Sequence, residues 1–219
     1  MFIGHVGPAS YFARRKLPLW HCFLAVQVID YIFFSLVFLG VEHVEVVPNA
    51  TAVNHFHTEH IGYSHSLISA VIFSVIAFWL YQLKNPSAGR SGALLIGALV
   101  FSHWLLDLVA HLPDLPLWPH GPVVGLGLWA FFWPSIIVES ALFSVGALVF
   151  FVLNRDRASR WTMPAILLLI VVALALVCVG FTGAAPRDVQ SGLAAAPFVL
   201  LVLTGLAYLV DRSLMSEVE

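Results

Sequence analysis

Long apolar stretches separated by short polar connections dominate this sequence. A helix needs about 20 predominantly apolar residues to cross the hydrocarbon core of a bilayer, and six stretches reach or approach that length. We therefore expect an all-α integral membrane protein with about six transmembrane helices. The expected spans are residues 17–41, 66–83, 91–110, 126–153, 163–181 and 193–210. Pro134 falls inside the fourth span, where it predicts a kink.

The segment before the first span is too short to cross a bilayer and too apolar for a free tail. We predict a short N-terminal half-helix that runs back into the membrane from the basic triplet at residues 14–16. At 1.5 Å per residue, His5 then lies on the order of 15 Å above that triplet. Asp30, thirteen residues after Leu17 in the first span, lies about 20 Å from the start of that span by the same rise. The side chains of His5 and Asp30 can therefore meet.

Composition gives the same class of protein. The chain has 219 residues, of which 60% are hydrophobic and 10% charged, and its mean hydropathy is +0.94. A soluble domain of this length could not bury that much apolar surface in one core. Because no internal repeat is present, we expect a single membrane domain over residues 1–219. Residues 1–140 form its metal and active-site half, and residues 141–219 supply supporting spans.

Positive charge is distributed unevenly among the connections. Nine of the ten lysines and arginines fall on one side of the expected spans, and only Arg187 falls on the other. By the positive-inside rule, both termini are cytoplasmic and the histidine-rich loops face outward. The formal net charge of −2 and the absence of a dense basic cluster give no reason to expect a nucleic-acid partner.

All ten histidines lie between His5 and His120, so the chemistry is expected in that part of the chain. The sharpest local pattern pairs His103 with Asp107, which share one helical face about one turn apart and suit two ligands of one ion. His111, four residues after Asp107, continues the same helical face. Alone, such a pair is more often a hydrogen-bonded polar pair than a metal site. Ionisable residues inside spans, however, usually face the bundle interior, where they pair or bind ions.

We expect five side chains to converge on one metal ion in the outer half of the membrane. They are His5, Asp30, His65, His103 and Asp107. Zn²⁺ accepts imidazole nitrogen together with carboxylate oxygen, and it lowers the pKa of bound water to about 7. Manganese or iron would accept the same ligands.

Several other polar residues have open roles. Glu42 and His111 are the candidates for moving protons, although Glu42 could instead orient a ligand. Glu139 is either a buried partner of a ligand histidine or a proton carrier. Ser64 or Ser66 could cap the second span and leave His65 pointing into the bundle. The remaining loop histidines, His55, His57 and His60, are expected to be solvated or peripheral.

In order and spacing, these motifs resemble the predicted membrane-bound metal-dependent hydrolases of the YdjM-like group, especially the bacterial branch often labelled permease. The matching pieces are Gly4-His5, Asp30, Gly40-Val-Glu42-His43, Tyr63-Ser64-His65-Ser66-Leu67, Ser102-His103-Trp-Leu-Leu-Asp107, His111-Leu-Pro113-Asp114-Leu-Pro116 and Gly125-Leu-Gly127-Leu-Trp129. The resemblance implies a helical fold in the bacterial inner membrane, a divalent metal and hydrolase activity. It extends more distantly to zinc-dependent phospholipase C.

One departure from the family pattern concerns the number of metal ions. Many members carry Pro-Asp-x-Asp where this chain has Val28-Ile29-Asp30-Tyr31-Ile32, so one carboxylate stands where they have two. The choice between one metal and two therefore stays open.

Two functions compete at this point. The first is a metal-dependent hydrolase in which activated water attacks a lipid or lipid-linked ester or phosphoester, because a site walled by apolar helices is most accessible to amphiphiles. The second is a transporter or permease for a metal ion or small solute that uses the same His/Asp site. Haem binding and serine hydrolysis are less favoured, because few histidines share a depth and no Gly-x-Ser-x-Gly motif is present. The oligomeric state is not indicated.

Overall fold

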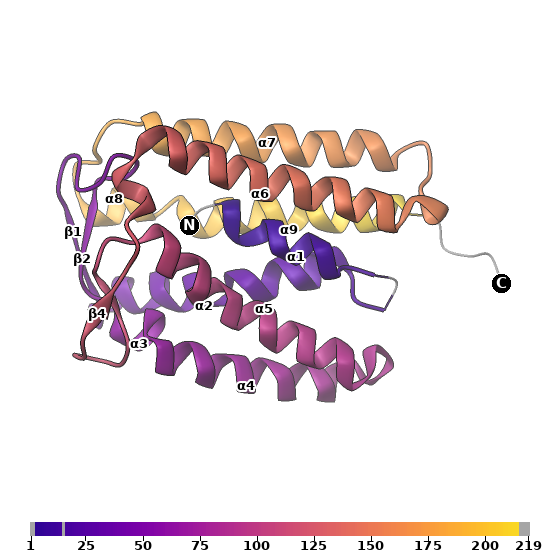
Figure 1. Cartoon of the computed structure of the whole chain (residues 1–219), viewed down its shortest axis with the longest axis horizontal. Coiled ribbons are helices and arrows are strands. Elements are labelled where there is room, and N and C mark those ends of the chain that lie inside the picture. Colours follow the sequence, from indigo (N-terminus) through magenta and orange to yellow (C-terminus); the bar gives the residue numbers. More distant parts are fainter. Residues whose placement is uncertain (1–2, 15, 215–219) are drawn as a thin grey trace.

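The computed structural model describes residues 3–14 and 16–214, which form an elongated bundle of α-helices (Figure 1). Within this part of the chain, six helices are long and apolar enough to cross a membrane, as the sequence predicts. They are α2 (Leu19–Phe38), α4 (Leu67–Lys84), α5 (Gly89–Ala110), α6 (Phe132–Leu153), α7 (Thr162–Thr182) and α9 (Ala196–Ser213). Residue 15 of the basic triplet lies outside the described residues.

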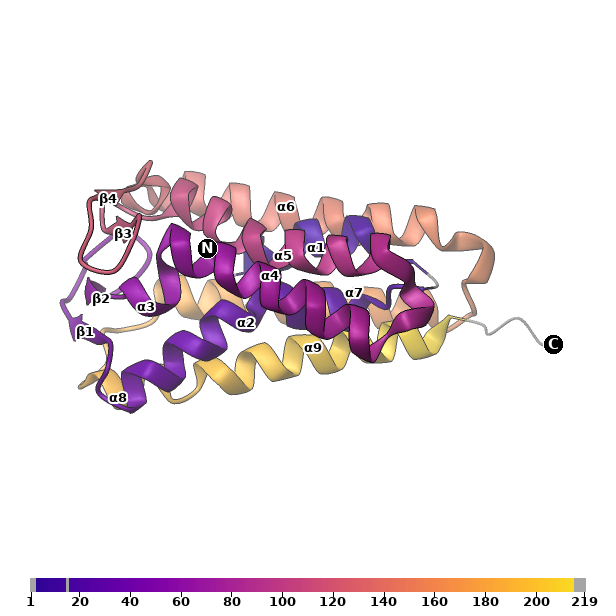
Figure 2. The ribbon, with the colours of Figure 1, turned by 90° about the horizontal axis from the view of Figure 1, so that it is seen from below.

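The two ends of the bundle differ in their connections. At one end, here called the basic end, short turns join the helices, including η2 (Pro86–Ala88) and η4 (Arg155–Arg157). The opposite end, here called the hairpin end, carries the small sheets and short helices (Figures 1 and 2). These are β1 (His43–Val46), β2 (Phe56–His60), α3 (Gly62–His65), β3 (Leu115–Pro116), β4 (Val123–Val124), η3 (Leu128–Ala130) and α8 (Val189–Leu193).

The connection between the first two expected spans, residues 42–64, contains a β-hairpin. Strands β1 and β2 pair antiparallel, with Val46 opposite Phe56 and Val44 opposite Thr58. Val44 is buried while its neighbours His43 and Glu45 are exposed, so the short strand has the alternation of a half-buried sheet. The hairpin thereby covers the end of the helical bundle.

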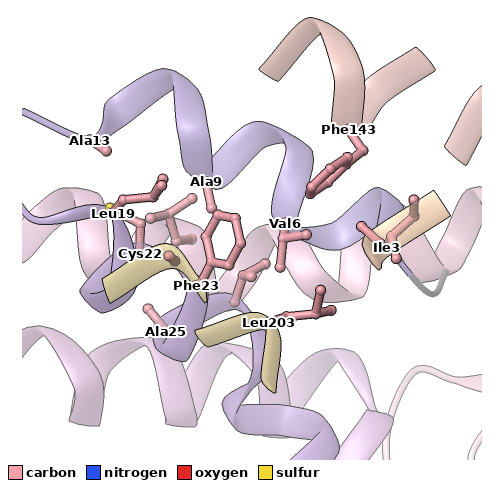
Figure 3. Packing of buried hydrophobic residues seen from close by; sticks show 14 of the residues in the cluster. Ile3, Val6, Ala9, Ala13, Leu19, Cys22, Phe23, Ala25, Phe143 and Leu203 are labelled. Carbon is pink, nitrogen blue, oxygen red and sulfur yellow. The ribbon is translucent and has the colours of Figure 1, made fainter. Parts of the chain in front are cut away.

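The predicted N-terminal half-helix is present and lies inside the bundle. A 3₁₀ turn, η1 (Ile3–His5), leads into α1 (Val6–Phe12), which packs against α6 and α2. Figure 3 shows Val6 and Ala9 pointing from α1 toward the side on which Phe23 of α2 lies. These three side chains are at most 1% exposed, so they form part of the central core.

Two glycines allow α1 and α6 to approach closely. A Cβ on Gly7 would come within 2.5 Å of the Leu142 carbonyl oxygen, and one on Gly146 would overlap the Gly7 carbonyl. Small residues are typical where helix backbones approach closely inside membranes. The position of α1 therefore depends on having glycine, which has no side chain, at both residues of this crossing.

The fourth span differs from the prediction at its start. Helix α6 begins at Phe132 rather than at residue 126, because Gly127 adopts a left-handed conformation and Phe131 is extended. Pro134 therefore lies in the first helical turn, where its missing N–H would have had no intrahelical partner. The prediction of a kink at Pro134 was wrong for this reason.

A carboxylate of the last helix holds the start of α2. The two Asp211 oxygens each accept a hydrogen bond, one from the Leu19 backbone N–H and one from the Trp20 backbone N–H, both at 3.0 Å. The first N–H groups of a helix lack intrahelical partners and favour negative charge. Asp211 of α9 therefore caps α2 across the bundle.

Candidate metal centre

The five predicted ligands come from four separated parts of the chain and lie together in the structure. His5 ends η1, Asp30 lies in α2, His65 ends α3, and His103 and Asp107 are one turn apart on α5. The Asp30 side chain is 21% exposed, and the other four are at most 6% exposed. Burial at this level is expected for ionisable groups that face a bundle interior.

The helix is interrupted at Ser66 between α3 and α4, and this interruption directs His65 toward the centre. Ser66 is extended, and its hydroxyl accepts a hydrogen bond from the Ser69 backbone N–H at 3.2 Å, which makes it the N-cap of α4. The capping role predicted for Ser64 or Ser66 thus falls to Ser66. His65 is consequently the last residue of a separate short helix.

Asp30, His65, His103 and Asp107 bring four possible ligand atoms close to one another. Asp30 Oδ1 lies 3.6 Å from Nε2 of His65 and 3.6 Å from Nε2 of His103. Asp107 Oδ2 lies 3.7 Å from the His65 nitrogen and 3.1 Å from the His103 nitrogen. Tetrahedral ligands at about 2.1 Å from a Zn²⁺ ion are separated by about 3.4 Å from one another. These four distances are near that value, and the groups of described residues whose ligand atoms all lie within 4.8 Å of one another are Asp30, His65 and His103, and His5, His103 and Asp107.

The second oxygen of Asp107 faces two further histidines. Asp107 Oδ1 lies 3.1 Å from His5 Nε2 and 3.8 Å from His111 Nε2. The His5 ring stacks on the His103 ring, with centroids 3.8 Å apart and planes 6° from parallel. Asp107 is thus the shared residue of the whole cluster, with histidines on both sides of its carboxylate.

Hydrogen bonds behind the cluster fix which ring nitrogen carries a proton. His103 Nδ1 lies 2.7 Å from the Val26 carbonyl oxygen, which can only accept, so Nδ1 is the donor. His65 Nδ1 lies 2.8 Å from the Ser64 hydroxyl, and that hydroxyl donates its own proton to Glu42 at 2.6 Å. The Ser64 oxygen therefore accepts from His65. Both histidines present a proton-free Nε2 to the centre.

His111 is oriented in the same way. Its Nδ1 donates to Asp114 Oδ1 at 2.9 Å, and Asp114 Oδ2 accepts from the Thr58 hydroxyl of β2 at 2.7 Å. Burial alone would raise the pKa of Asp114, but the hydrogen bonds from His111 and Thr58 outweigh it and hold that pKa below its usual range. The spacing of three residues between His111 and Asp114 was a usable signal of this pair in the sequence.

A divalent cation would suit the place where these side chains meet. The Nε2 atoms of His65, His103 and His111 lie 3.1–3.8 Å from oxygens of Asp107. The Nε2 atoms of His5 and His103 are buried and make no hydrogen bond within the described chain. A divalent metal ion would give such nitrogens a partner, since metal-ligating histidines normally donate their other ring nitrogen to a carbonyl or carboxylate, as His103 and His111 do here. The cluster could therefore hold a metal ion.

Glu42 and Glu139 lie behind the cluster rather than in it. Glu42 is 1% exposed, and its Oε1 accepts from the backbone N–H groups of Tyr63 and Ser64 at 2.9 and 2.8 Å. Its contacts are those of a residue that orients His65 through Ser64. Glu139 accepts from the Gly4 backbone N–H at 3.2 Å and thereby supports the turn that carries His5. These partners could not be read from the sequence.

The cluster opens into a cavity at the hairpin end. This cavity has a volume of about 140 Å³, and it is lined by Asp30, His65, Asp107 and His111 together with residues of the β1–β2 hairpin. A neighbouring, mostly apolar cavity of about 410 Å³ lies between the hairpin and the ends of α7 and α9 nearest to it. The two cavities share part of their lining, namely Asp30, Asn54, Phe56, Trp129 and Leu193.

The remaining loop histidines lie away from the centre. His57 and His60 are exposed on β2. His55 accepts from the Asn49 backbone N–H and bonds the Gly183 carbonyl oxygen at 2.9 Å, which links the hairpin to the segment after α7. Their peripheral position agrees with the prediction.

Comparison with known protein families identifies the family of this chain. The family described as YdjM inner membrane protein matches residues 11–186, a segment that includes every residue of the cluster except His5. Comparisons with curated proteins and with solved structures gave no match. The family match covers most of the chain, and the six apolar helices agree with a location in the membrane. This integral membrane protein therefore belongs to the YdjM inner membrane protein family.

Proposed function

We propose that this protein is a metal-dependent hydrolase that cleaves a lipid or lipid-linked phosphoester within the membrane. The observation that carries the proposal is the cluster of four histidines and two aspartates at the floor of a cavity that continues into an apolar one. Polar groups that converge in a largely apolar pocket are the usual form of a small-molecule site. The metal-ligand roles of His5, Asp30, His65, His103 and Asp107 belong to this proposal.

A divalent cation held in the cluster would supply a water that is a nucleophile near neutral pH. The protein's part is to fix the ligands before substrate arrives. Glu42 and Ser64 hold the ring of His65, and the Val26 carbonyl holds that of His103. Supports of this kind keep the ligand geometry and raise the basicity of the imidazoles. Zinc suits this mixture of imidazole and carboxylate ligands, and manganese or iron would accept the same atoms.

The two cavities support an amphiphilic substrate. A water occupies about 30 Å³ of liquid, so the cavity of about 140 Å³ at the cluster suits a compact polar head group. The cavity of about 410 Å³ is lined by side chains such as Phe34, Phe181 and Leu200, which suit an alkyl or prenyl chain. The resemblance to zinc-dependent phospholipase C supports a phosphoester over an amide.

The charge distribution supports an orientation in the inner membrane. The described lysines and arginines other than Arg187 lie at the basic end, and the cluster opens toward the hairpin end. By the positive-inside rule, the basic end is cytoplasmic, both termini belong to that side, and the site faces the outer leaflet.

The same layout favours a hydrolase over the permease alternative. Between the cluster and the basic end, fully buried side chains such as Val6, Ala9 and Phe23 fill the bundle. A solute that reached the cluster from the hairpin end would meet this packed apolar layer. A site open to one side suits chemistry on a substrate that enters and leaves by the same route.

The test is hydrolysis by the purified full-length protein in detergent. We expect release of product from phospholipid or polyprenyl phosphoesters, loss of that release on chelation and its return with added Zn²⁺ or Mn²⁺. Asp107→Asn should abolish it, whereas Asp188→Asn changes an exposed loop carboxylate in the same way and should leave it intact. Chelator-insensitive release, or substrate-independent ion flux in proteoliposomes, would refute the hydrolase.

The apolar cavity can be tested separately from the metal. Gly180 lines it, and an added Cβ there meets no atom within 4 Å, so Gly180→Leu should partly fill the cavity without a clash at Cβ. Gly205 on α9 has the same free space and lines neither cavity, which makes Gly205→Leu the matched control. We expect only the first variant to shift preference toward short-chain substrates. Equal effects of the two variants would refute the chain-binding role.

A further inference from the structure

A third cavity, here called the polar cavity, lies beside the cluster cavity at the hairpin end. It has a volume of about 280 Å³, and its polar side chains are Glu59, His60, Tyr63, Asp114 and His120. Ile61 and Asp114 line both this cavity and the cluster cavity. Asp114 also accepts from His111 Nδ1 at 2.9 Å, so the polar cavity borders the cluster directly.

The polar cavity and the apolar cavity adjoin different parts of the cluster cavity. The polar cavity lies between the end of β2, the start of α3 and the loop over residues 116–123, whereas the apolar one lies against α7, α8 and α9. No described residue lines both. Figures 1 and 2 show α3 and β4 apart from α8 at this end of the bundle. A molecule with its chain in the apolar cavity can therefore extend past the cluster into the polar one.

The lining of the polar cavity suits hydroxyl groups better than a further phosphate. Carboxylates accept hydrogen bonds from hydroxyls, and imidazole and phenol groups can donate or accept. No lysine or arginine is among the described residues that line the cavity, so an anionic group has no cation to pair with there. The His120 ring contacts those of His60 and Tyr63 edge to face, with centroids 5.4 and 6.1 Å away. Flat ring faces beside hydrogen-bonding groups suit a sugar.

From this arrangement we infer that the substrate carries a hydroxyl-rich polar group, such as a sugar, beyond its phosphoester, and that the polar cavity binds this group. The inference names the substrate class of the proposed hydrolase and rests on that proposal. The chain, the phosphoester and the sugar occupy the apolar, cluster and polar cavities in turn. His120 is a specificity-determining residue, because its ring lies against both His60 and Tyr63.

The backbone at His120 allows its side chain to be removed without strain. Its φ is 59°, a left-handed conformation that favours glycine, so His120→Gly deletes the ring and suits the backbone. Asn49 has the same φ of 59°, is exposed and lines none of the three cavities. Asn49→Gly is therefore the matched control.

Binding to the metal-free protein tests the inference without hydrolysis. The full-length protein, stripped with a chelator in a detergent that has no sugar head group, is titrated calorimetrically with dodecyl glucosyl phosphate and with dodecyl methyl phosphate. We expect the glucosyl compound to bind at least about 10-fold more tightly, because a site built to hydrogen-bond hydroxyls rejects an analogue that lacks them. His120→Gly should lose most of this preference, and Asn49→Gly should keep it. Equal affinities in the wild type, or an unchanged preference in His120→Gly, would overturn the inference.

Methyl glucosyl phosphate distinguishes a lipid-linked sugar from a free one. It lacks the chain that the apolar cavity accepts, so it should bind at least about 10-fold more weakly than the dodecyl compound. Equal binding of the two would overturn the lipid-linked substrate.

The same dodecyl compounds, added to metal-loaded protein, separate this inference from the hydrolase itself. Faster release of product from the glucosyl compound supports both. Equal release from the two compounds would overturn the inference and leave the hydrolase standing. Preferential binding of the glucosyl compound without release from either would overturn the hydrolase and support the sugar site alone.

Discussion

The chain from Glu42 through Ser64 to His65 gives a prediction whose size can be worked out. In Ser64→Ala, the hydroxyl that accepts from His65 Nδ1 at 2.8 Å and donates to Glu42 at 2.6 Å is lost. Removing the partner that orients a metal-ligating histidine typically weakens metal affinity 10–100-fold. At about 1.4 kcal/mol per factor of ten, this is a loss of about 1.4–2.8 kcal/mol in binding.

The same substitution has a second readout, the stability of the metal-free protein. Glu42 keeps the bonds from the Tyr63 and Ser64 backbone N–H groups but loses its bond from the Ser64 hydroxyl. Hydrogen bonds to charged groups contribute about 1.5–3 kcal/mol, so the metal-free protein should also be less stable by an amount of that order. Competition with a chelating dye measures the Zn²⁺ affinity, and thermal unfolding in detergent measures the stability.

Ser69→Ala separates the two effects. The Ser69 hydroxyl accepts from the Ser66 hydroxyl at 2.9 Å and donates to the Gly62 carbonyl oxygen at 3.2 Å, and it does not touch His65. This variant loses two hydrogen bonds only a few residues away, so it should lower stability with little change in Zn²⁺ affinity. If both variants weaken Zn²⁺ binding to the same extent, or if Ser64→Ala leaves the affinity unchanged, the orienting role is refuted.

Three further outcomes are expected. Gly146→Ala should displace α1, because the added methyl would overlap the Gly7 carbonyl. Overpacking of this kind costs about 1–3 kcal/mol of stability, and the metal content should fall. Gly205→Ala is the control, because the space beside Gly205 is open and its metal content should not fall. Asp211→Ala should destabilise the protein by about 1–2 kcal/mol in detergent unfolding by uncapping α2, with metal content unchanged; a change in metal content would contradict the capping role. Chelation should lower the melting temperature, because bound metal at 1,000 times its Kd stabilises by about 4 kcal/mol; an unchanged melting temperature would count against a metal in the cluster.

The spans and the meeting of the five polar residues were accessible to sequence reasoning because lipid imposes simple rules. Apolar stretches of sufficient length become helices, and ionisable groups within them turn inward. The rise of a helix then gives depth, which brought His5 and Asp30 to the same level. These arguments need no knowledge of how the helices pack.

The supporting contacts could not be predicted because they depend on tertiary packing. Glu42 reaches His65 only because β1 and β2 pair and bring the end of α2 beside α3. Glu139 reaches the Gly4 backbone through the close crossing of α1 and α6. The late start of α6 likewise reflects backbone conformations at Gly127 and Phe131 that apolar composition concealed.

The place of α1 has a consequence for biogenesis. Its principal neighbour, α6, begins at Phe132, so residues 3–12 leave the ribosome long before the helix against which they pack. Until then, the Gly4 N–H and His5 lack the surroundings that Glu139 and α5 provide. Residues 3–12 are made before these partners and are therefore among the last to take their place, and the centre is complete only once the fourth span has been inserted.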